Sequence, residues 1–219
     1  GVQDISPVSG SFIAAQMDSV LSDIGADAVK TGMLLTRAAV CAVAEKIGSY
    51  RLKNVVVDPV MIAKGGRAMM QDAARKAVIS KLLPLAFVVT PNIPEAEALT
   101  GLKIRSVADM KKAAVVIIKT GVKNVVIKGG HLPDGRKKGS VDILYDGKQY
   151  YEYRADWIDT KNTHGTGCTF ASALAASLAQ DKTMIQAVEQ AKRFVTEAIA
   201  NSLSVGNGHG PVNVLGKMY

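Results

Sequence analysis

The chain has 219 residues, of which 48% are hydrophobic and 21% are charged, and its formal net charge is +8. This length suits one domain with a sizeable core, and the apolar fraction excludes a disordered chain. No apolar run is long enough to cross a bilayer, and the opening Gly1-Val2-Gln3-Asp4 lacks the layout of a secretory signal. We therefore expect no membrane partner.

The two cysteines, Cys41 and Cys168, are too few for a disulfide framework and predict a protein of the reducing cytoplasm. The positive charge would permit nucleic-acid binding, but Lys and Arg are spread along the chain and cluster only at Arg136-Lys137-Lys138. Aromatic residues make up only 5% of the chain, which leaves few platforms for stacked bases. We expect no nucleic-acid partner. The charge is interpreted as a basic cleft for polyphosphate, with an inert basic surface as the alternative.

Helical and extended segments alternate along the first 130 residues. The patterns predict helices over 9–24, 36–47, 71–83, 94–100 and 106–119, and strands over 28–31, 54–59, 87–91 and 125–130. The β-branched run Val55-Val56-Val57 is typical of a parallel strand covered on both faces. Ser9 is the expected N-cap of the first helix and Gly25 its end. Residues 61–68 and 133–139 are expected to form polar loops.

The pattern changes in the last third of the chain. Residues 141–145 and 149–153 flank Asp146-Gly147, a strong signal for a β-hairpin. Helices are expected over 171–179 and 183–203, the second with a capping box formed by Thr183 and Gln186. The whole sequence predicts an α/β fold with a mostly parallel central sheet, helices on both faces and a late antiparallel hairpin.

A polar segment punctuated by glycines, Asn162 to Phe170, precedes the first of these late helices. Backbone amides at the start of a helix, together with the helix dipole, attract phosphate. Gly165, Thr166, Gly167 and Cys168 are the candidates for such an anion-binding turn. A helix N-terminus also favours the thiolate form of a cysteine. Taken alone, the segment fits either phosphoryl transfer or a cysteine enzyme with a covalent intermediate.

Polar residues follow several of the predicted strands. Asp58 ends one strand, Asn92 and Glu95 follow the next, and Lys128 ends a third. Ligands of open α/β sheets bind beyond the carboxyl ends of the strands, where two acids, an amide and a lysine can hold Mg²⁺ and phosphate. Each residue alone has an ordinary explanation: a strand end for Asp58, a helix cap for Asn92 and Glu95, and an edge lysine for Lys128. Their joint occurrence favours a site.

Other motifs are excluded. The sequence contains no G-x-x-x-x-G-K-[ST] loop, and no G-x-G-x-x-G follows a strand. His131, His164 and His209 do not have the spacing of zinc ligands, and Cys41 is interpreted as a small core residue.

Six segments occur together and in a fixed order. They are Lys30-Thr31-Gly32-Met33-Leu34, Asp58-Pro59-Val60-Met61, Thr90-Pro91-Asn92-Ile93-Pro94-Glu95-Ala96, Lys128-Gly129-Gly130-His131, Asn162 to Thr169, and Gly208-His209-Gly210-Pro211-Val212. On these segments the chain resembles the hydroxymethylpyrimidine/phosphomethylpyrimidine kinases of the ribokinase superfamily. The resemblance runs over nearly the whole chain and implies a single three-layer ribokinase-like domain over residues 1–219.

The resemblance implies two successive phosphorylations with ATP and Mg²⁺, first of the hydroxymethyl group of an aminopyrimidine and then of its monophosphate. It places Cys168 as the catalytic base, where related enzymes carry an aspartate, and the amides of Gly165, Thr166, Gly167 and Cys168 as the anion hole. We also expect a homodimer. The remaining implied roles are nucleotide contacts for Lys128, Asn92, Thr163 and Gly208, the metal region for Glu95 and Asp58, and the pyrimidine pocket for Met33 and Val60.

One departure from the family pattern and one difference from a related group of kinases bear on the alternatives. The family carries an earlier βαβ unit before the position that matches Gly1, so we expect such a unit to be missing from this sequence. Related pyridoxal kinases carry a second cysteine on the loop after the segment that matches Asp58 to Met61, where this chain has Ala63. This favours the pyrimidine kinase. A pyridoxal kinase and a non-catalytic pyrimidine- or nucleotide-binding protein remain the alternatives.

Overall fold

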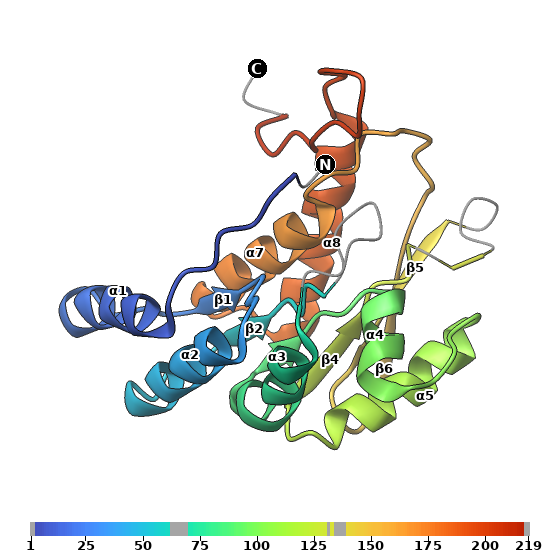
Figure 1. The fold of residues 1–219 in the computed structure, drawn as a ribbon. Coiled ribbons are helices and arrows are strands. Elements are labelled where there is room, and N and C mark those ends of the chain that lie inside the picture. Colours follow the sequence, from blue (N-terminus) through green and yellow to red (C-terminus); the bar gives the residue numbers. More distant parts are fainter. Residues whose placement is uncertain (1–2, 62–69, 131, 134–138, 217–219) are drawn as a thin grey trace.

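A six-stranded sheet forms the centre of the computed structural model, which describes residues 3–61, 70–130, 132–133 and 139–216 (Figure 1). The strands follow one another in the sheet in sequence order: β1 (Val29–Thr31), β2 (Val55–Val57), β3 (Val88–Val89), β4 (Asn124–Ile127), β5 (Ser140–Tyr145) and β6 (Tyr150–Ala155). The first four strands are parallel, and β5 and β6 are antiparallel to their neighbours. The predicted mixed sheet with a late hairpin is confirmed.

Helices cover both faces of this sheet, as Figure 1 shows. They are α1 (Gly10–Asp23), α2 (Arg37–Ser49), α3 (Asp72–Ala77), α4 (Ile93–Thr100), α5 (Val107–Ile118), α7 (Thr166–Ala179) and α8 (Met184–Ala200). A π-helical turn (Val78–Leu82) and a 3-10 turn (Leu83–Leu85) extend α3. Side chains alternate between the faces of a strand, so Val55 and Val57 pack toward α2 to α5 while Val56 packs against α7 and α8. Two apolar layers therefore sandwich the sheet, as the three-layer prediction requires.

The predicted helix starts are confirmed where a side chain caps them. Ser9 accepts a hydrogen bond from the Phe12 amide, and Thr183 and Gln186 form the expected capping box at the start of α8. The prediction for α7 was wrong at its start, because the helix begins at Thr166 rather than at Ala171. The glycine-punctuated turn is thus mostly the first turn of the helix itself.

Helix α1 was predicted correctly, but much of its apolar face is not covered. Ile13 and Met17 pack against the core cluster under α2, whereas Phe12 is 59% exposed and Ile24 is 80% exposed. No residue of α1, which the structure describes from end to end, is fully buried. Helix periodicity therefore identified the element, but it does not show how much of the apolar face is covered.

The hairpin turn is held by Asp146, whose Oδ1 accepts hydrogen bonds from the amides of Lys148 and Gln149 at 2.8 and 2.7 Å. Most of the loops expected over 61–68 and 133–139 lies outside the described residues, as does His131. Within the described ranges, no helix has the length and apolar character needed to span a membrane.

Candidate active site

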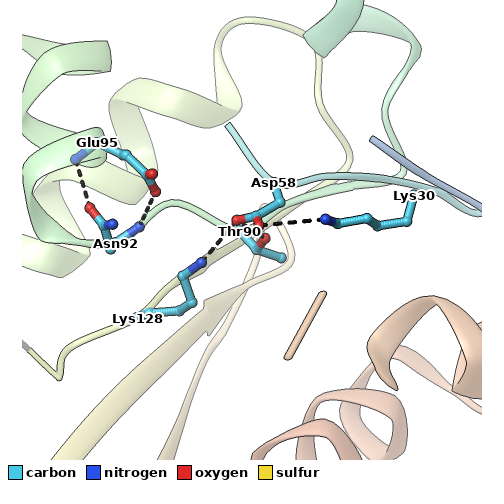
Figure 2. A network of polar contacts seen from close by, with 6 residues as sticks. All are labelled: Lys30, Asp58, Thr90, Asn92, Glu95 and Lys128. Atoms are coloured by element: carbon cyan, nitrogen blue, oxygen red, sulfur yellow. Dashed lines mark hydrogen bonds and ion pairs between the residues drawn. The ribbon is translucent and has the colours of Figure 1, made fainter. Parts of the chain in front are cut away.

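Asp58 lies at the centre of a polar cluster at the carboxyl ends of the parallel strands (Figure 2). It follows β2 directly, and its amide donates to the carbonyl of Thr31 at 3.0 Å, so the backbone that carries it is held by β1. The residue is only 2% exposed. The Nζ of Lys128, which follows β4, donates to Oδ1 of Asp58 at 3.0 Å. The strand ends thus bring together two of the predicted site residues that are 70 positions apart.

Lys30 is a member of this cluster to which the sequence analysis gave no role. Its Nζ lies 3.8 Å from Oδ2 of Asp58, on the side opposite Lys128, as Figure 2 shows. The Thr90 hydroxyl completes the surroundings with a long 3.5 Å hydrogen bond to Oδ1 of Asp58. The signal for Lys30 was its place in β1, one residue before the Thr-Gly step that ends the strand. Two ammonium groups therefore meet at one buried carboxylate.

Asn92 and Glu95 form a complete capping box at the start of α4. The Asn92 side chain accepts from the Glu95 amide at 2.9 Å, and Oε2 of Glu95 accepts from the Asn92 amide at 2.8 Å. Both residues therefore cap a helix, which is the ordinary explanation of their occurrence. The cap also fixes the Glu95 carboxylate, which is 3% exposed, at the edge of the cluster around Lys128.

Burial raises the pKa of Glu95 to about 6. The charge of Lys128 and hydrogen bonds from the backbone of Asn92 and Met61 oppose this shift, and the negative charge of Asp58 adds to it. A raised pKa means that burial disfavours the charged form of the carboxylate, and a cation bound nearby would favour that form again. This property marks Glu95 as a residue whose charge matters to the site.

The first turn of α7 presents its backbone amides to the same region. Gly165 has a φ of +85°, which glycine adopts without strain, and this conformation turns the chain into the helix. Among the residues that the structure describes, no side chain caps this helix. A Cβ built on Gly167 would lie 3.3 Å from Nζ of Lys128 and 3.9 Å from Oδ2 of Asp58. The helix N-terminus and the charged cluster are therefore one site.

The C-terminal segment holds the approach to this helix in place. The His164 amide donates to the carbonyl of Gly210 at 3.0 Å, and the Val212 amide donates back to His164 at 3.1 Å. The Gly210 amide also donates to Oδ1 of buried Asn162 at 3.2 Å. These bonds join the late glycine-rich segment to the chain that leads into α7.

The remaining predicted residues border this region without a charged contact in it. Cys168 is exposed in the first turn of α7. Met33 follows β1 and is 43% exposed, and Val60 follows β2 and is half-buried, so they extend from adjacent strands. Thr163 accepts a hydrogen bond from the Thr166 hydroxyl through its carbonyl, at 3.2 Å, and Gly208 lies exposed in the C-terminal segment.

A cavity of about 500 Å³ lies beside Cys168 between α7 and α8. Its lining includes Thr169, Ser172, Phe194 and Val214. The lining also includes Cys168 of the first turn of α7, and it does not include Asp58, Glu95 or Lys128.

The donor set fits a magnesium ion that is shared with a phosphate. Mg²⁺ takes one or two carboxylates and completes its shell with water and phosphate oxygens. Asp58 and Glu95 are buried carboxylates near one another, and the raised pKa of Glu95 is the property that a cation would reverse. Across the described residues, no group of three or more His, Cys, Asp or Glu side chains forms a metal cage. A pair of buried carboxylates is the protein's share of a shell that Mg²⁺ completes with water and phosphate oxygens.

The family model for phosphomethylpyrimidine kinase matches residues 1–213. The hydroxymethylpyrimidine/phosphomethylpyrimidine kinase of Bacillus subtilis is 45% identical over 213 residues, which are 97% of this chain and 78% of that protein. The chain belongs to the phosphomethylpyrimidine kinase family. The thiamine biosynthesis bifunctional protein ThiED of Geobacter sulfurreducens is 49% identical over 97% of this chain, which spans only 43% of that longer protein.

The fold of this phosphomethylpyrimidine kinase family member is also similar to solved kinase structures. An ADP complex of Bacillus subtilis pyridoxal kinase superposes with a TM-score of 0.90 at 39% identity, over 97% of this chain and 79% of that one. The resemblance inferred from the sequence segments and the ribokinase-like fold are thereby confirmed.

Proposed function

We propose that the chain transfers the γ-phosphoryl group of ATP to the hydroxymethyl group of an aminopyrimidine, and then phosphorylates the resulting monophosphate. The observation that carries this proposal is the meeting of Lys128, Asp58 and the uncapped N-terminus of α7 at one point. Family membership supplies the substrate class.

Charge neutralisation and positioning are what phosphoryl transfer asks of a protein. Lys128 and Lys30 provide two ammonium groups that Asp58 holds beside the helix. The amides of Gly165, Thr166, Gly167 and Cys168 provide hydrogen-bond donors for the oxygens of the transferred group. An incoming polyphosphate would take over the lysines from Asp58, because it offers more negative charge at the same place.

Cys168 is the proposed base. Its thiolate would accept the proton of the substrate hydroxyl, whose oxygen forms the new bond to phosphorus as the bond to ADP breaks. Its exposed place in the first turn of α7 leaves the sulfur open to a substrate. Met33 and Val60 would border the pyrimidine, and Asn92, Thr163 and Gly208 the nucleotide.

Mg²⁺ is the proposed metal, and it would neutralise phosphate charge when it is bound. Glu95 would hold it with Asp58, through water or directly. The capping box fixes the Glu95 carboxylate in advance, so no side-chain ordering is needed when the ion arrives.

The test is Mg²⁺-dependent ADP formation with hydroxymethylpyrimidine as the acceptor. Cys168→Ala should lower kcat on the order of 10²–10⁴-fold, the usual contribution of a general base. Cys41→Ala is the matched control, because Cys41 belongs to α2 and lies half-buried against the core cluster, away from the site, so its loss should leave kcat near the wild-type value. Near-normal turnover of Cys168→Ala would remove the base assignment, and an inactive wild-type protein would remove the function.

Phosphorylation of pyridoxal is the second candidate, because the pyridoxal kinase structure superposes so closely. The ratio of kcat/KM for hydroxymethylpyrimidine and pyridoxal decides between them. We expect the pyrimidine to be preferred, and a preference for pyridoxal would reverse the order of the two proposals.

Small molecules and a second copy of the chain are the proposed partners, and nucleic acid is not. The expected results are a dimer mass in solution and no salt-dependent binding to an oligonucleotide.

A further inference from the structure

A second Asp-Lys pair lies buried between β5 and α8, outside the proposed chemistry. Nζ of Lys192 donates to Oδ2 of Asp142 and to the Ser140 hydroxyl, both at 2.9 Å. Asp142 is 5% exposed and Lys192 8% exposed. Burying two charges is costly unless other hydrogen bonds complete their surroundings. The other carboxylate oxygen of Asp142 connects this pair to the backbone next to Lys128.

Oδ1 of Asp142 accepts a hydrogen bond from the Gly129 amide at 2.8 Å. The register of β4 and β5 pairs Ile127 with Ile143, and β4 ends at Ile127. After β4 ends, the Gly129 amide therefore donates to the Asp142 carboxylate instead of to a backbone carbonyl of β5. The contact is tight, because a Cβ on Gly129 would overlap the carbonyl oxygen of Val141.

Lys128 therefore lies between two backbone anchors. Its own amide donates to the carbonyl of Pro91 at 2.9 Å, on the β3 side, and the next amide is held by Asp142 on the β5 side. From this fixed backbone its Nζ reaches Asp58 beside Gly167. A shift of the Gly129 peptide would move the ammonium group away from the N-terminus of α7.

We infer that Asp142 and Lys192 are positioning residues for Lys128, and that they set where its ammonium group meets the phosphates of the nucleotide. Lys192 orients the carboxylate, and the carboxylate holds the Gly129 amide. Since Lys192 belongs to α8, which packs with α7 in one core cluster, the pair also ties the lysine strand to the helix layer of the anion site. This inference rests on the proposed function, because it assigns Lys128 to the nucleotide.

Two double variants test it, and they differ only in the acceptor for Gly129. Asp142→Leu/Lys192→Met replaces both charges with apolar side chains, an exchange that buried ion pairs often tolerate. Asp142→Asn/Lys192→Met also removes both charges but keeps a carbonyl oxygen for the amide. The first should lower kcat on the order of 10–100-fold and raise KM for ATP, because small misplacements of a contact group carry such costs, while KM for the pyrimidine stays unchanged. The second should restore most of the loss.

Ser140→Ala is the matched control, because it removes only the other hydrogen bond to Lys192 and should leave kcat and both KM values near those of the wild type. A folded Leu/Met variant with wild-type kcat and KM for ATP would overturn the inference, as would equal losses in the Leu/Met and Asn/Met variants. If the Leu/Met variant does not fold, hydrogen exchange of the wild-type Gly129 amide decides. Strong protection supports the anchor, and exchange at the rate of an open amide overturns it.

ADP binding measured by calorimetry separates this inference from the proposed function. If the wild type phosphorylates no pyrimidine but binds ADP, weaker binding by Leu/Met than by Asn/Met supports the positioning role while the proposed reaction fails. Equal ADP affinity in all forms overturns the positioning role whether or not the wild type is active.

Discussion

The two buried Asp-Lys pairs are nearly identical as isolated contacts. Lys128 lies 3.0 Å from Asp58 and Lys192 lies 2.9 Å from Asp142, and all four side chains are largely buried. Their surroundings differ. Asp142 binds an ammonium group with one oxygen and a backbone amide with the other, both at short distance. The Asp58 carboxylate has one short bond, to Lys128, and its other polar contacts with described residues are a lysine at 3.8 Å and a hydroxyl at 3.5 Å.

The difference indicates opposite uses of the same chemistry. Each carboxylate oxygen of Asp142 has a partner at a short distance, so a rearrangement would break good hydrogen bonds, and the pair serves to fix the backbone. Among the described residues, the pair at Asp58 has weaker additional contacts and lies beside helix amides that no side chain caps, which fits the proposed exchange of the carboxylate for a polyphosphate as the partner of the lysines. Burial and distance alone do not tell a structural ion pair from one that is poised for a ligand.

The largest expected effect is on stability, at the pair of Asp142 and Lys192. Lys192→Met leaves the Asp142 carboxylate buried without its cation and should lower the free energy of unfolding by about 3–5 kcal/mol. Urea unfolding measures this effect. Arg193→Met, which removes the same charge from an exposed neighbour on α8, should change it by less than about 0.5 kcal/mol. Equal effects of the two variants would show that the pair has no structural role.

Next in size is the effect on activity at the pair of Asp58 and Lys128. Lys128→Met should lower kcat/KM for ATP on the order of 10²–10³-fold, as expected when a charge-stabilising donor is lost. The loss of stability should be smaller than for Lys192→Met, because Lys30 still faces Asp58. Lys123→Met, exposed at the other end of the same strand, should leave steady-state kinetics unchanged. A Lys128→Met variant that is unstable but active would reverse the comparison.

A third effect depends on pH. The pKa of Glu95 is raised to about 6 in the folded protein, so its stabilising contribution is fully present below the unfolded value of 4.5 and is lost as the pH rises through 6. Glu95→Gln should therefore be more stable than the wild type by about 2 kcal/mol at about pH 8 and show no such gain near pH 4. Urea unfolding at both pH values measures this difference.

The same variant should lose Mg²⁺-dependent activity, so the site would be more stable without its function. Glu45→Gln, on the exposed side of α2, is the control and should change stability by less than about 0.5 kcal/mol at either pH. A stability gain for Glu95→Gln that is the same at pH 4 and pH 8 would contradict the electrostatic explanation.

The smallest effect is expected at Thr90. Thr90→Val keeps the shape of the side chain and removes the 3.5 Å hydrogen bond to Asp58, which should cost about 0.5–1 kcal/mol or less. A loss as large as that of Lys192→Met, measured by the same unfolding experiment, would mean that the surroundings of Asp58 are as complete as those of Asp142.

Much of the fold was predictable because local signals and tertiary packing agree. The β-branched run at Val55–Val57 became β2, and the helix predicted over 36–47 became α2, which buries Ala39, Val40, Val43, Ala44 and Ile47. The start of α7 was missed because two glycines and three polar residues hid the first helical turn, which tertiary contacts stabilise against weak propensity. The exposure of the apolar face of α1 could not be predicted, because periodicity identifies an apolar stripe and says nothing of what covers it.

The sequence predicted which residues of the site lie at the ends of strands, but it predicted fewer of the contacts between side chains. Asp58 and Lys128 were both named from the rule that ligands bind at the carboxyl ends of the strands, and the structure joins them directly. Lys30 and the pair of Asp142 with Lys192 were missed, because each contact depends on which strand or helix lies beside which. Sequence spacing does not carry that information.

The two glycines that follow Lys128 differ in the space that surrounds them. At Gly129 any side chain would overlap the carbonyl oxygen of Val141, whereas a Cβ on Gly130 would meet no described atom within 4 Å. In a library that randomises both positions, selection should accept glycine alone at 129 and a wide range of residues at 130. Position 130 is therefore a place to attach a fluorophore close to Lys128, and position 129 is not.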